Sequence, residues 1–410
     1  MDLLFAGAPP TLHPGRCLNH RHAGAHCTAC VDACPAQAIA LDGATPHLDT
    51  DACVRCGVCA AICPTDSFVA PIDYAKKLCE TVANLPQGPI ALVCAVHPAP
   101  DVTTANITAA KELVVVQHRR CLAALSVAHL LDLSAGGRRS LWLDDSPCAA
   151  CPIGAAQQTL ARTVDAARTV LHSSGLPSAL LLHSERPPTA DVQPRRVTLH
   201  DGAQPAISRR ALLAFLRPQR PAAQGTPFAH NLLQAGAPLS ERLPQATPPS
   251  RRRLLTVMGA LPATEAGELT TAGTPFGAVQ VDGARCSGCG LCARFCPTGA
   301  LHLTQADDRF ALAFQPAVCI DCAICVVTCP EQAVSLGDTV SLAAILTDEV
   351  APLATGELVK CVGCGVLTAQ HADDPSPRCY VCRQRAGAVT PLRDGAGLMA
   401  DLLARTAKRS

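Results

Sequence analysis

Between residues 89 and 183 the chain alternates short apolar runs with longer segments in which apolar positions recur every three or four residues. The short runs have the length of buried strands, and the longer segments have the period of amphipathic helices. The runs are PIALVCAVH, ELVVVQHRRC, SLWLDDSPC and SALLLHS, and the helical segments include LAALSVAHLLDL and AAQQTLARTVDAARTVLHSSG. Strands that alternate with helices favour a parallel sheet. The pattern therefore predicts an open α/β domain over residues 89–183.

Two shorter units flank this domain, at residues 1–72 and 275–345. Each unit contains two cysteine runs, and in the first unit they are separated by AQAIALDGATPHLDTDA, which predicts a strand, a Gly turn and a return strand. The last cysteine of each run is followed by a related tail, which reads PAQAI, PTDSF, PTGAL or PEQAV. The sequence therefore predicts two copies of one small module.

Residues 184–274 form a Pro-rich and Arg-rich connector, with breakers such as SERPP, FLRPQRP and QATPPSRRR. We expect it to be partly extended, with one short amphipathic helix over SRRALLAFLR that begins at the N-cap Ser208. A last segment, residues 346–410, ends in GLMADLLARTAK, which has the pattern of an amphipathic helix. The expected fold class is multidomain α+β and α/β.

Cysteine usage narrows the class of protein. The chain has 410 residues and 25 cysteines, with spacings typical of metal ligands and not of a secreted disulfide framework. The N-terminus lacks the pattern of a secretory signal, so a reducing cytoplasm is the expected location. No apolar stretch reaches the length of about 18 residues that a membrane span needs, so we expect no integral membrane association.

Charge and aromatic content argue against a nucleic-acid partner, since the net charge is only +1 and aromatic residues make up 3% of the chain. The charge is unevenly distributed. Residues 186–253 contain eleven Arg and three acidic residues, whereas the remainder is net acidic. This basic stretch can dock an acidic partner, although a solvated face is the simpler interpretation.

Three stretches share one cysteine spacing: CSGCGLCARFCP from Cys286, CIDCAICVVTCP from Cys319 and CVRCGVCAAICP from Cys53. Three cysteines two residues apart, a fourth after three more residues and then Pro is the spacing that wraps a cubane iron–sulfur cluster. CTACVDACP from Cys27 is an imperfect copy, with its first cysteine displaced upstream to Cys17. Buried apolar cysteines would not repeat one spacing, and a zinc site commonly uses two separated pairs.

Both units resemble bacterial-type ferredoxins, which carry two [4Fe–4S] clusters in a compact α+β fold. In that family the fourth cysteine of each run ligates the cluster of the other run. The resemblance implies four ligand sets. The Cys53 set is Cys34, Cys53, Cys56 and Cys59, and the Cys17 set is Cys17, Cys27, Cys30 and Cys63. The Cys286 set is Cys286, Cys289, Cys292 and Cys329, and the Cys319 set is Cys296, Cys319, Cys322 and Cys325.

The Cys17 set departs from the family pattern, which would place a cysteine where this chain has Gly24. Instead the loop LNHRHAGAH separates Cys17 from Cys27 and offers His20, His22 and His26 as competing ligands. Thiolate is the usual ligand of cluster iron, so Cys17 is the favoured fourth ligand. Ligation by one of the histidines and a three-iron cluster are the alternatives.

Four cysteines of the α/β domain follow predicted strands; the sheet-edge cysteines are Cys94, Cys121, Cys148 and Cys151. Carboxyl ends of parallel strands meet at one edge, where ligands gather, so these thiols are expected to converge and can bind a further iron–sulfur cluster. The segment resembles the small iron–sulfur delta subunits of methanogen-type hydrogenases, although Cys94 stands alone where that family has a pair. The alternatives are a redox disulfide between Cys148 and Cys151, or separate structural thiols.

Two cysteine pairs near the C-terminus, in KCVGCG and RCYVCR, are fourteen residues apart. These C-terminal cysteines are Cys361, Cys364, Cys379 and Cys382. Two such pairs close a tetrahedral zinc site, and the segment resembles a zinc ribbon, although a rubredoxin-type iron site uses the same ligands. The remaining cysteine, Cys79, lies in the helical pattern YAKKLCETVANL and is expected to be structural.

Cubane clusters held by thiolates exchange single electrons. We therefore expect a cytoplasmic protein with four [4Fe–4S] clusters and one zinc that relays electrons to or from a partner oxidoreductase, a carrier or complex subunit with no catalytic residue of its own. No Gly-rich dinucleotide fingerprint follows a strand, and neither a P-loop nor a CxxCH haem motif occurs. The alternatives are an accessory protein for the maturation of an anaerobic redox enzyme, and a disulfide- or sulfur-reducing enzyme that uses the sheet-edge cysteines.

Overall fold

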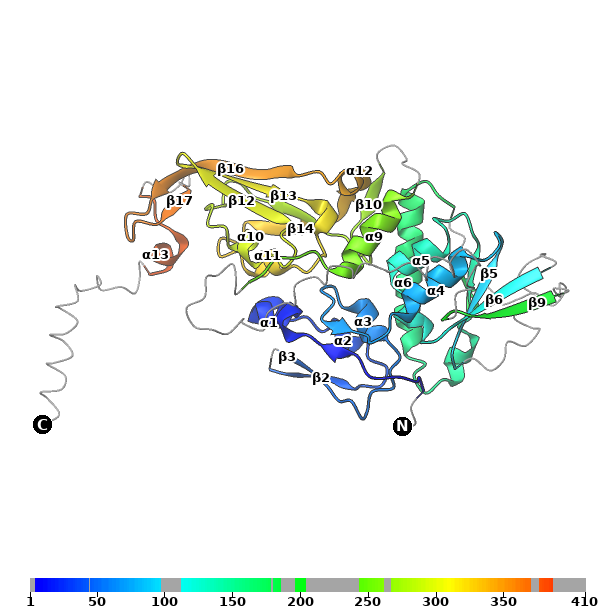
Figure 1. Ribbon diagram of the computed structural model, residues 1–410. Coiled ribbons are helices and arrows are strands. Elements are labelled where there is room, and N and C mark those ends of the chain that lie inside the picture. The colour runs from blue at the N-terminus through cyan, green and yellow to red at the C-terminus, as the bar shows by residue number, and fades with distance from the viewer. Residues whose placement is uncertain are drawn as a thin grey trace, which may run out of the picture.

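The computed structural model in Figure 1 describes residues 4–43, 45–96, 112–177, 180–185, 196–203, 243–261, 267–369 and 376–385. The helices predicted at 208–217 and 397–408 lie outside these residues. Within them, every helix is too short or too polar to cross a lipid bilayer.

The α/β domain is built on a five-stranded parallel sheet with the strand order β8-β7-β5-β6-β9. Its elements are α4 (Tyr74–Ala83), β5 (Ile90–Cys94), β6 (Glu112–His118), η4 (Leu122–Ala124), α5 (Val127–Leu133), β7 (Leu141–Leu143), η5 (Ser146–Ala150), α6 (Ala156–Ser173), β8 (Leu180–Leu182) and β9 (Arg196–Asp201). The four predicted parallel strands are confirmed. The edge strand β9 was not predicted, because it lies in the stretch that its Pro and Arg content marks as a connector.

One face of the sheet carries the main apolar core. Ile90, Leu92 and Val116 are fully buried there against helices α4, α5 and α6. The opposite face holds a smaller cluster with Ala91 and Trp142. The strand order makes the chain cross back over β5 between β6 and β7, and such a crossover opens a crevice at the carboxyl ends of the strands.

The first cysteine-rich module contains the predicted strand–turn–strand, formed by β2 (Ile39–Asp42) and β3 (Thr45–Leu48), which pair antiparallel. A second pair joins β1 (Thr11–Leu12) to β4 (Phe68–Val69), so the two ends of the module meet. Three short helices lie between these strands: α1 (Leu18–Arg21), α2 (Ala29–Asp32) and α3 (Val58–Ile62). The 3-10 turn η2 (Ala23–Ala25) follows α1.

The second module repeats this plan. Strand β12 (Leu301–Ala306) pairs with β13 (Arg309–Phe314), and β11 (Ala278–Val281) pairs with β14 (Val334–Gly337). Its short helices are α10 (Leu291–Phe295) and α11 (Ile324–Val327).

The C-terminal segment continues the sheet of the second module. Strand β16 (Ala351–Lys360) pairs antiparallel with β13, and β17 (Leu367–Ala369) pairs with β16. Helix α13 (Tyr380–Arg385) follows. Although the sequence suggests a separate unit here, its first strands belong to the four-stranded sheet β12-β13-β16-β17.

The connector contributes ordered elements that tie the modules to the α/β domain. Helix α9 (Pro249–Gly259) packs against α5 and α12 (Leu342–Leu346), and β10 (Glu268–Thr270) pairs with β15 (Thr339–Ser341). Buried residues of all three parts, among them Val58, Leu130 and Phe276, belong to one continuous apolar cluster. In Figure 1, helices α4, α5 and α6 lie between the parallel sheet and the two modules.

Arg139 anchors helix α4 to the core of the α/β domain. The side chain is buried, and its guanidinium donates to the carbonyl oxygens of Val82 at 3.1 Å, Leu85 at 3.4 Å and Pro86 at 3.1 Å. Val82 lies in the last turn of α4, and Leu85 and Pro86 follow the end of the helix, so Arg139 ties this end of α4 to the core.

We expect Arg139→Met to lower the free energy of unfolding of the α/β domain by about 2–3 kcal/mol, because buried carbonyls lose their donors. Arg138→Met is the matched control, since Arg138 is exposed. The measurement is anaerobic urea denaturation followed through the fluorescence of Trp142, the only tryptophan of the chain, which lies in β7. Equal unfolding midpoints for the two variants would contradict this role.

Candidate functional site

The first module brings its eight cysteines together in two groups. The Cys17 set lines one cavity, and the Cys53 set lines another. Cys34 and Cys63 are exchanged between the runs, because each lies in the cavity of the other run. The two groups have the membership that the ferredoxin resemblance implies.

The second module shows the same exchange. The Cys286 set, which includes Cys329 from the other run, lines a cavity of its own. In the Cys319 set, burial raises the pKa of Cys322 to about 12, and the neighbouring thiolates of Cys296 and Cys319 add to the shift. Cys325 lies within electrostatic reach of the same three thiols and also of Cys292 in the Cys286 set, so the four cysteines of the Cys319 set lie near one another.

A local turn explains how the last cysteine of each run reaches its place. In all four runs the backbone N–H four residues later donates to the cysteine sulfur: Ala38 to Cys34 at 3.3 Å, Ser67 to Cys63 at 3.2 Å, Ala300 to Cys296 at 3.2 Å and Ala333 to Cys329 at 3.3 Å. The residue before each donor has a positive φ: Gln37, Asp66, Gly299 and Gln332. The turn therefore directs a donor at a sulfur in every run, and such bonds tune a metal-bound thiolate.

The imperfect run keeps the backbone turn of the complete ones. The residue before the second cysteine has a positive φ in all four runs: Arg55, Gly288, Asp321 and His26. His26 therefore occupies a conformation that the fold requires at this point of each run, and its side chain is exposed.

The inserted loop returns the chain so that Cys17 joins its set. Cys17 is the N-cap of α1, and Asn19 clamps the end of the loop by donating to the Cys27 carbonyl at 2.8 Å and accepting from the Cys27 N–H at 2.7 Å. Of the competing histidines, His20 is exposed, and the ring of His22 packs edge-on against Phe295 of the second module at 5.1 Å.

The sheet-edge cysteines lie at the carboxyl ends of β5, β6 and β7, as predicted. Cys94 ends β5, Cys121 follows β6, and Cys148 and Cys151 lie in and directly after η5. Burial raises the pKa of Cys148 to about 12, with further contributions from Cys94 and Cys151. The structure therefore brings these thiols into electrostatic reach of one another.

The sheet-edge cysteines also adjoin the first module. Burial raises the pKa of Cys121, and Cys56 of the Cys53 set adds to the shift before Cys94 and Cys148 do. Helix α3 packs on η4 so tightly that a Cβ at Gly57 would lie 3.1 Å from the Cβ of Ala124. The edge of the sheet and the Cys53 set are therefore neighbours.

His118 is a residue that the sequence did not single out. It is the register partner of Cys94, it is 1% exposed, and neither ring nitrogen has a hydrogen-bond partner within the described part of the chain. Burial lowers its pKa to about 4, so the ring is neutral at physiological pH. Its place at the end of a buried strand, beside a cysteine, was the available signal.

The C-terminal cysteines form the tightest group of candidate ligands. Their four Sγ atoms lie within 4.8 Å of one another, a spacing that suits a single metal ion. Cys361 directly follows β16, and its sulfur accepts from the N–H groups of Cys379 at 3.2 Å and Gly363 at 3.4 Å. Burial acts to raise the pKa of Cys361, but these donors together lower it to about 6, which favours the thiolate that a metal binds.

Two crossed groups of four thiols in each module define the class of two-cluster iron–sulfur modules. Residues 25–67 and 285–333 match the family model of the 4Fe-4S dicluster domain. The first match begins after most of the inserted loop, so Cys17 lies outside it. No curated protein and no solved structure matches the chain.

These findings support an iron–sulfur electron-transfer protein with two ferredoxin-like modules and up to four clusters. The donor sets suit that cofactor, since thiolates are the usual ligands of cluster iron. The C-terminal cysteines can bind a metal. The predicted resemblance of the α/β domain to hydrogenase delta subunits has no counterpart in the comparisons.

Proposed function

We propose that the chain is a cytoplasmic polyferredoxin in which the Cys17, Cys53, Cys286 and Cys319 sets each hold one [4Fe–4S] cluster. The observation that carries this proposal is the exchange of the last cysteine between runs, which puts four thiols in each of the cavities of the Cys17, Cys53 and Cys286 sets. Bound clusters would supply one-electron chemistry. The protein's part is to hold the thiolates, donate hydrogen bonds to sulfur and limit the access of water.

The order of the groups favours a relay. The sheet-edge cysteines adjoin the Cys53 set, and α1 of the Cys17 set contacts the backbone of Cys296 in the Cys319 set. Cys325 lies within electrostatic reach of Cys292, which leads on to the Cys286 set. Of the sixteen ferredoxin cysteines, all of which the structure describes, only Cys289 is exposed. The Cys286 set is therefore the proposed contact point for a partner oxidoreductase.

For the C-terminal cysteines we propose a structural zinc ion, with a rubredoxin-type iron as the alternative. Their four sulfur atoms lie close together, and the site adjoins strands β16 and β17, which extend the sheet of the second module. A metal there would hold β17 and α13 together where few apolar residues are buried.

Anaerobically purified protein is expected to contain about sixteen iron for the four ferredoxin sets, as much acid-labile sulfide and about one zinc per chain, with any iron at the sheet-edge cysteines in addition. Cys17→Ser is expected to lower the iron by about one to four per chain, through a three-iron cluster or loss of the whole cluster. His26→Ala is the matched control and should leave iron unchanged, because His26 is exposed. If His26→Ala lost the iron and Cys17→Ser did not, the ligand assignment would be wrong.

A carrier and an accessory protein differ in whether electrons flow. The chain reduced with dithionite is expected to take up about four electrons, and its absorbance should return within the turnover time of an added partner oxidoreductase. Activation of an apo-enzyme without any change in that absorbance would instead support the accessory role. The apo form of the same chain controls for activation that needs no cluster.

The sheet-edge cysteines are proposed as an additional metal or cluster site at the end of the relay, with a thiol–disulfide couple at Cys148 and Cys151 as the alternative. The double substitution Cys94→Ser and Cys121→Ser is expected to lower iron from above sixteen to about sixteen per chain, if a cluster is bound there. Unchanged iron at about sixteen would leave the α/β domain metal-free. Loss of disulfide or sulfur reduction in Cys148→Ser and Cys151→Ser, with iron intact, would support the enzymatic alternative.

A further inference from the structure

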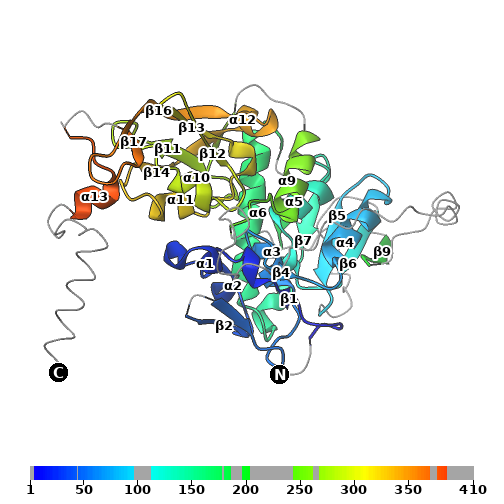
Figure 2. The ribbon, with the colours of Figure 1, turned by 60° about the vertical axis from the view of Figure 1, so that its left-hand side comes forward.

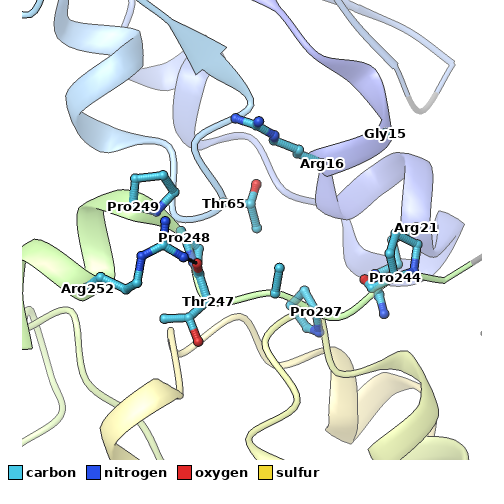
Figure 3. Close-up of a pocket in the computed structure, with 11 residues that line it drawn as sticks. Gly15, Arg16, Arg21, Thr65, Pro244, Thr247, Pro248, Pro249, Arg252 and Pro297 are labelled. Carbon is cyan, nitrogen blue, oxygen red and sulfur yellow. Dashed lines mark hydrogen bonds between the residues drawn. The ribbon is translucent and has the colours of Figure 1, made fainter. Parts of the chain in front are cut away.

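The inserted loop of the first module is also the joint to the second module. Arg21, at the end of α1, donates hydrogen bonds to carbonyl oxygens of the segment before α9 and of the end of α10: Leu243 at 3.2 Å, Pro244 at 2.7 Å, Arg294 at 3.5 Å, Phe295 at 2.7 Å and Cys296 at 3.1 Å. Figure 2 shows α1 beside α10 and α11. In Figure 3, Arg21 lies with Pro244 at one side of the cavity between the modules.

The guanidinium of Arg251, in helix α9 of the connector, lies beside the Cys319 set, which Arg21 also contacts through the carbonyl of Cys296. Arg251 of α9 is 3% exposed and donates to the carbonyl oxygens of Ala317 at 2.7 Å, Pro316 at 3.2 Å and Pro275 at 2.7 Å. It also lies over the ring of Phe276, 4.2 Å from its centroid. Ala317 is two residues before Cys319, so this cation is buried at the first cysteine of the run.

Neither guanidinium is paired with a carboxylate within the described residues, because their hydrogen bonds go to backbone carbonyls. Among the acids, Asp321 lies near Cys319, so the Cys319 set has two guanidinium groups and one carboxyl group close to it. The charges around the Cys17 set differ. Asp32 lies near Cys27, and Arg16 donates to the backbone carbonyl of Asp66, three residues after Cys63. The Cys319 set is thus the more positive partner of the facing pair.

The sign of the effect follows from elementary electrostatics. A cluster held by four thiolates carries negative charge and becomes more negative when it takes up an electron. A fixed, partly desolvated cation nearby therefore stabilises the reduced form and raises the reduction potential. The attraction is reciprocal, since Cys296 and Cys322 raise the pKa of Arg21 against the larger, opposing effect of burial.

We propose that Arg21 and Arg251 raise the reduction potential of the cluster at the Cys319 set, so that this set accepts electrons from the Cys17 set. The inference rests on the proposed function. In the transfer one electron leaves the cluster of the Cys17 set and enters that of the Cys319 set, with no other reactant. Because Arg21 belongs to the first module, it raises the potential only when the modules are docked. Both arginines are positioning residues, since neither is a ligand.

The test is an anaerobic redox titration of the full chain, followed by electron paramagnetic resonance. In Arg21→Gln and in Arg251→Gln, the reduction equilibrium constant of one cluster is expected to fall about tenfold, which is about 59 mV for a one-electron couple. The other three clusters should keep their potentials. Arg252→Gln is the matched control, since Arg252 is exposed on the same helix and its charge is screened.

Arg21→Lys separates charge from structure. Lysine keeps the positive charge but cannot donate to five carbonyls, so a potential close to that of the native chain is expected. A lysine variant that behaves like Arg21→Gln would show that the contact is merely structural and would overturn the proposal. So would unchanged potentials in Arg21→Gln at full iron content. If Arg251→Gln loses its cluster, the Arg21 variants decide alone.

Failure of the proposed function looks different. In that case the native chain and the variants at position 21 alike would contain far fewer than about sixteen iron per chain. The iron content of every variant is therefore measured before its titration.

Discussion

The two cysteine runs of each module depend on each other, because the last thiol of one run lies in the cavity of the other. The buried apolar residues of the first module's own core are few, namely Cys30, Ile39, Cys59 and Phe68, and two of them are cysteines. So small a core stabilises little by burial alone. Bonds from thiolates to a shared metal would therefore replace much of the packing that larger domains use.

Both cysteine-rich modules pack against the α/β domain. Val58 of the first module and Phe276 beside the second belong to the same apolar cluster as Leu130 of helix α5. Packing of this kind fixes the distances between groups of thiols, whereas a flexible linker would let them vary. The Pro-rich connector contributes to this rigidity through α9, whose buried face includes Leu254 and Met258.

Much of the site could be predicted because cysteine spacing is a local property. The spacing identified the cysteine runs, and the resemblance to ferredoxins implied which thiols share a group. The apolar runs implied four of the five parallel strands, with thiols at their carboxyl ends. Contacts between distant segments left no such signal. The pairing of β16 with β13, the approach of Cys121 to Cys56 and the burial of His118 depend on tertiary packing. The inserted loop offered histidines as candidate ligands, but its main contact with the second module is made by Arg21.

The position of Cys17 at the start of α1 has a consequence for biogenesis. The helix that presents Arg21 begins at a thiol of the Cys17 set, and Asn19 fastens its other side to Cys27 of the same set. In a first module without its metal, helix α1 would be held less firmly, and Arg21 would bind the second module less well. Docking of the two halves would thus report that the first has matured, and premature assembly of an unloaded chain would be disfavoured without any dedicated checkpoint.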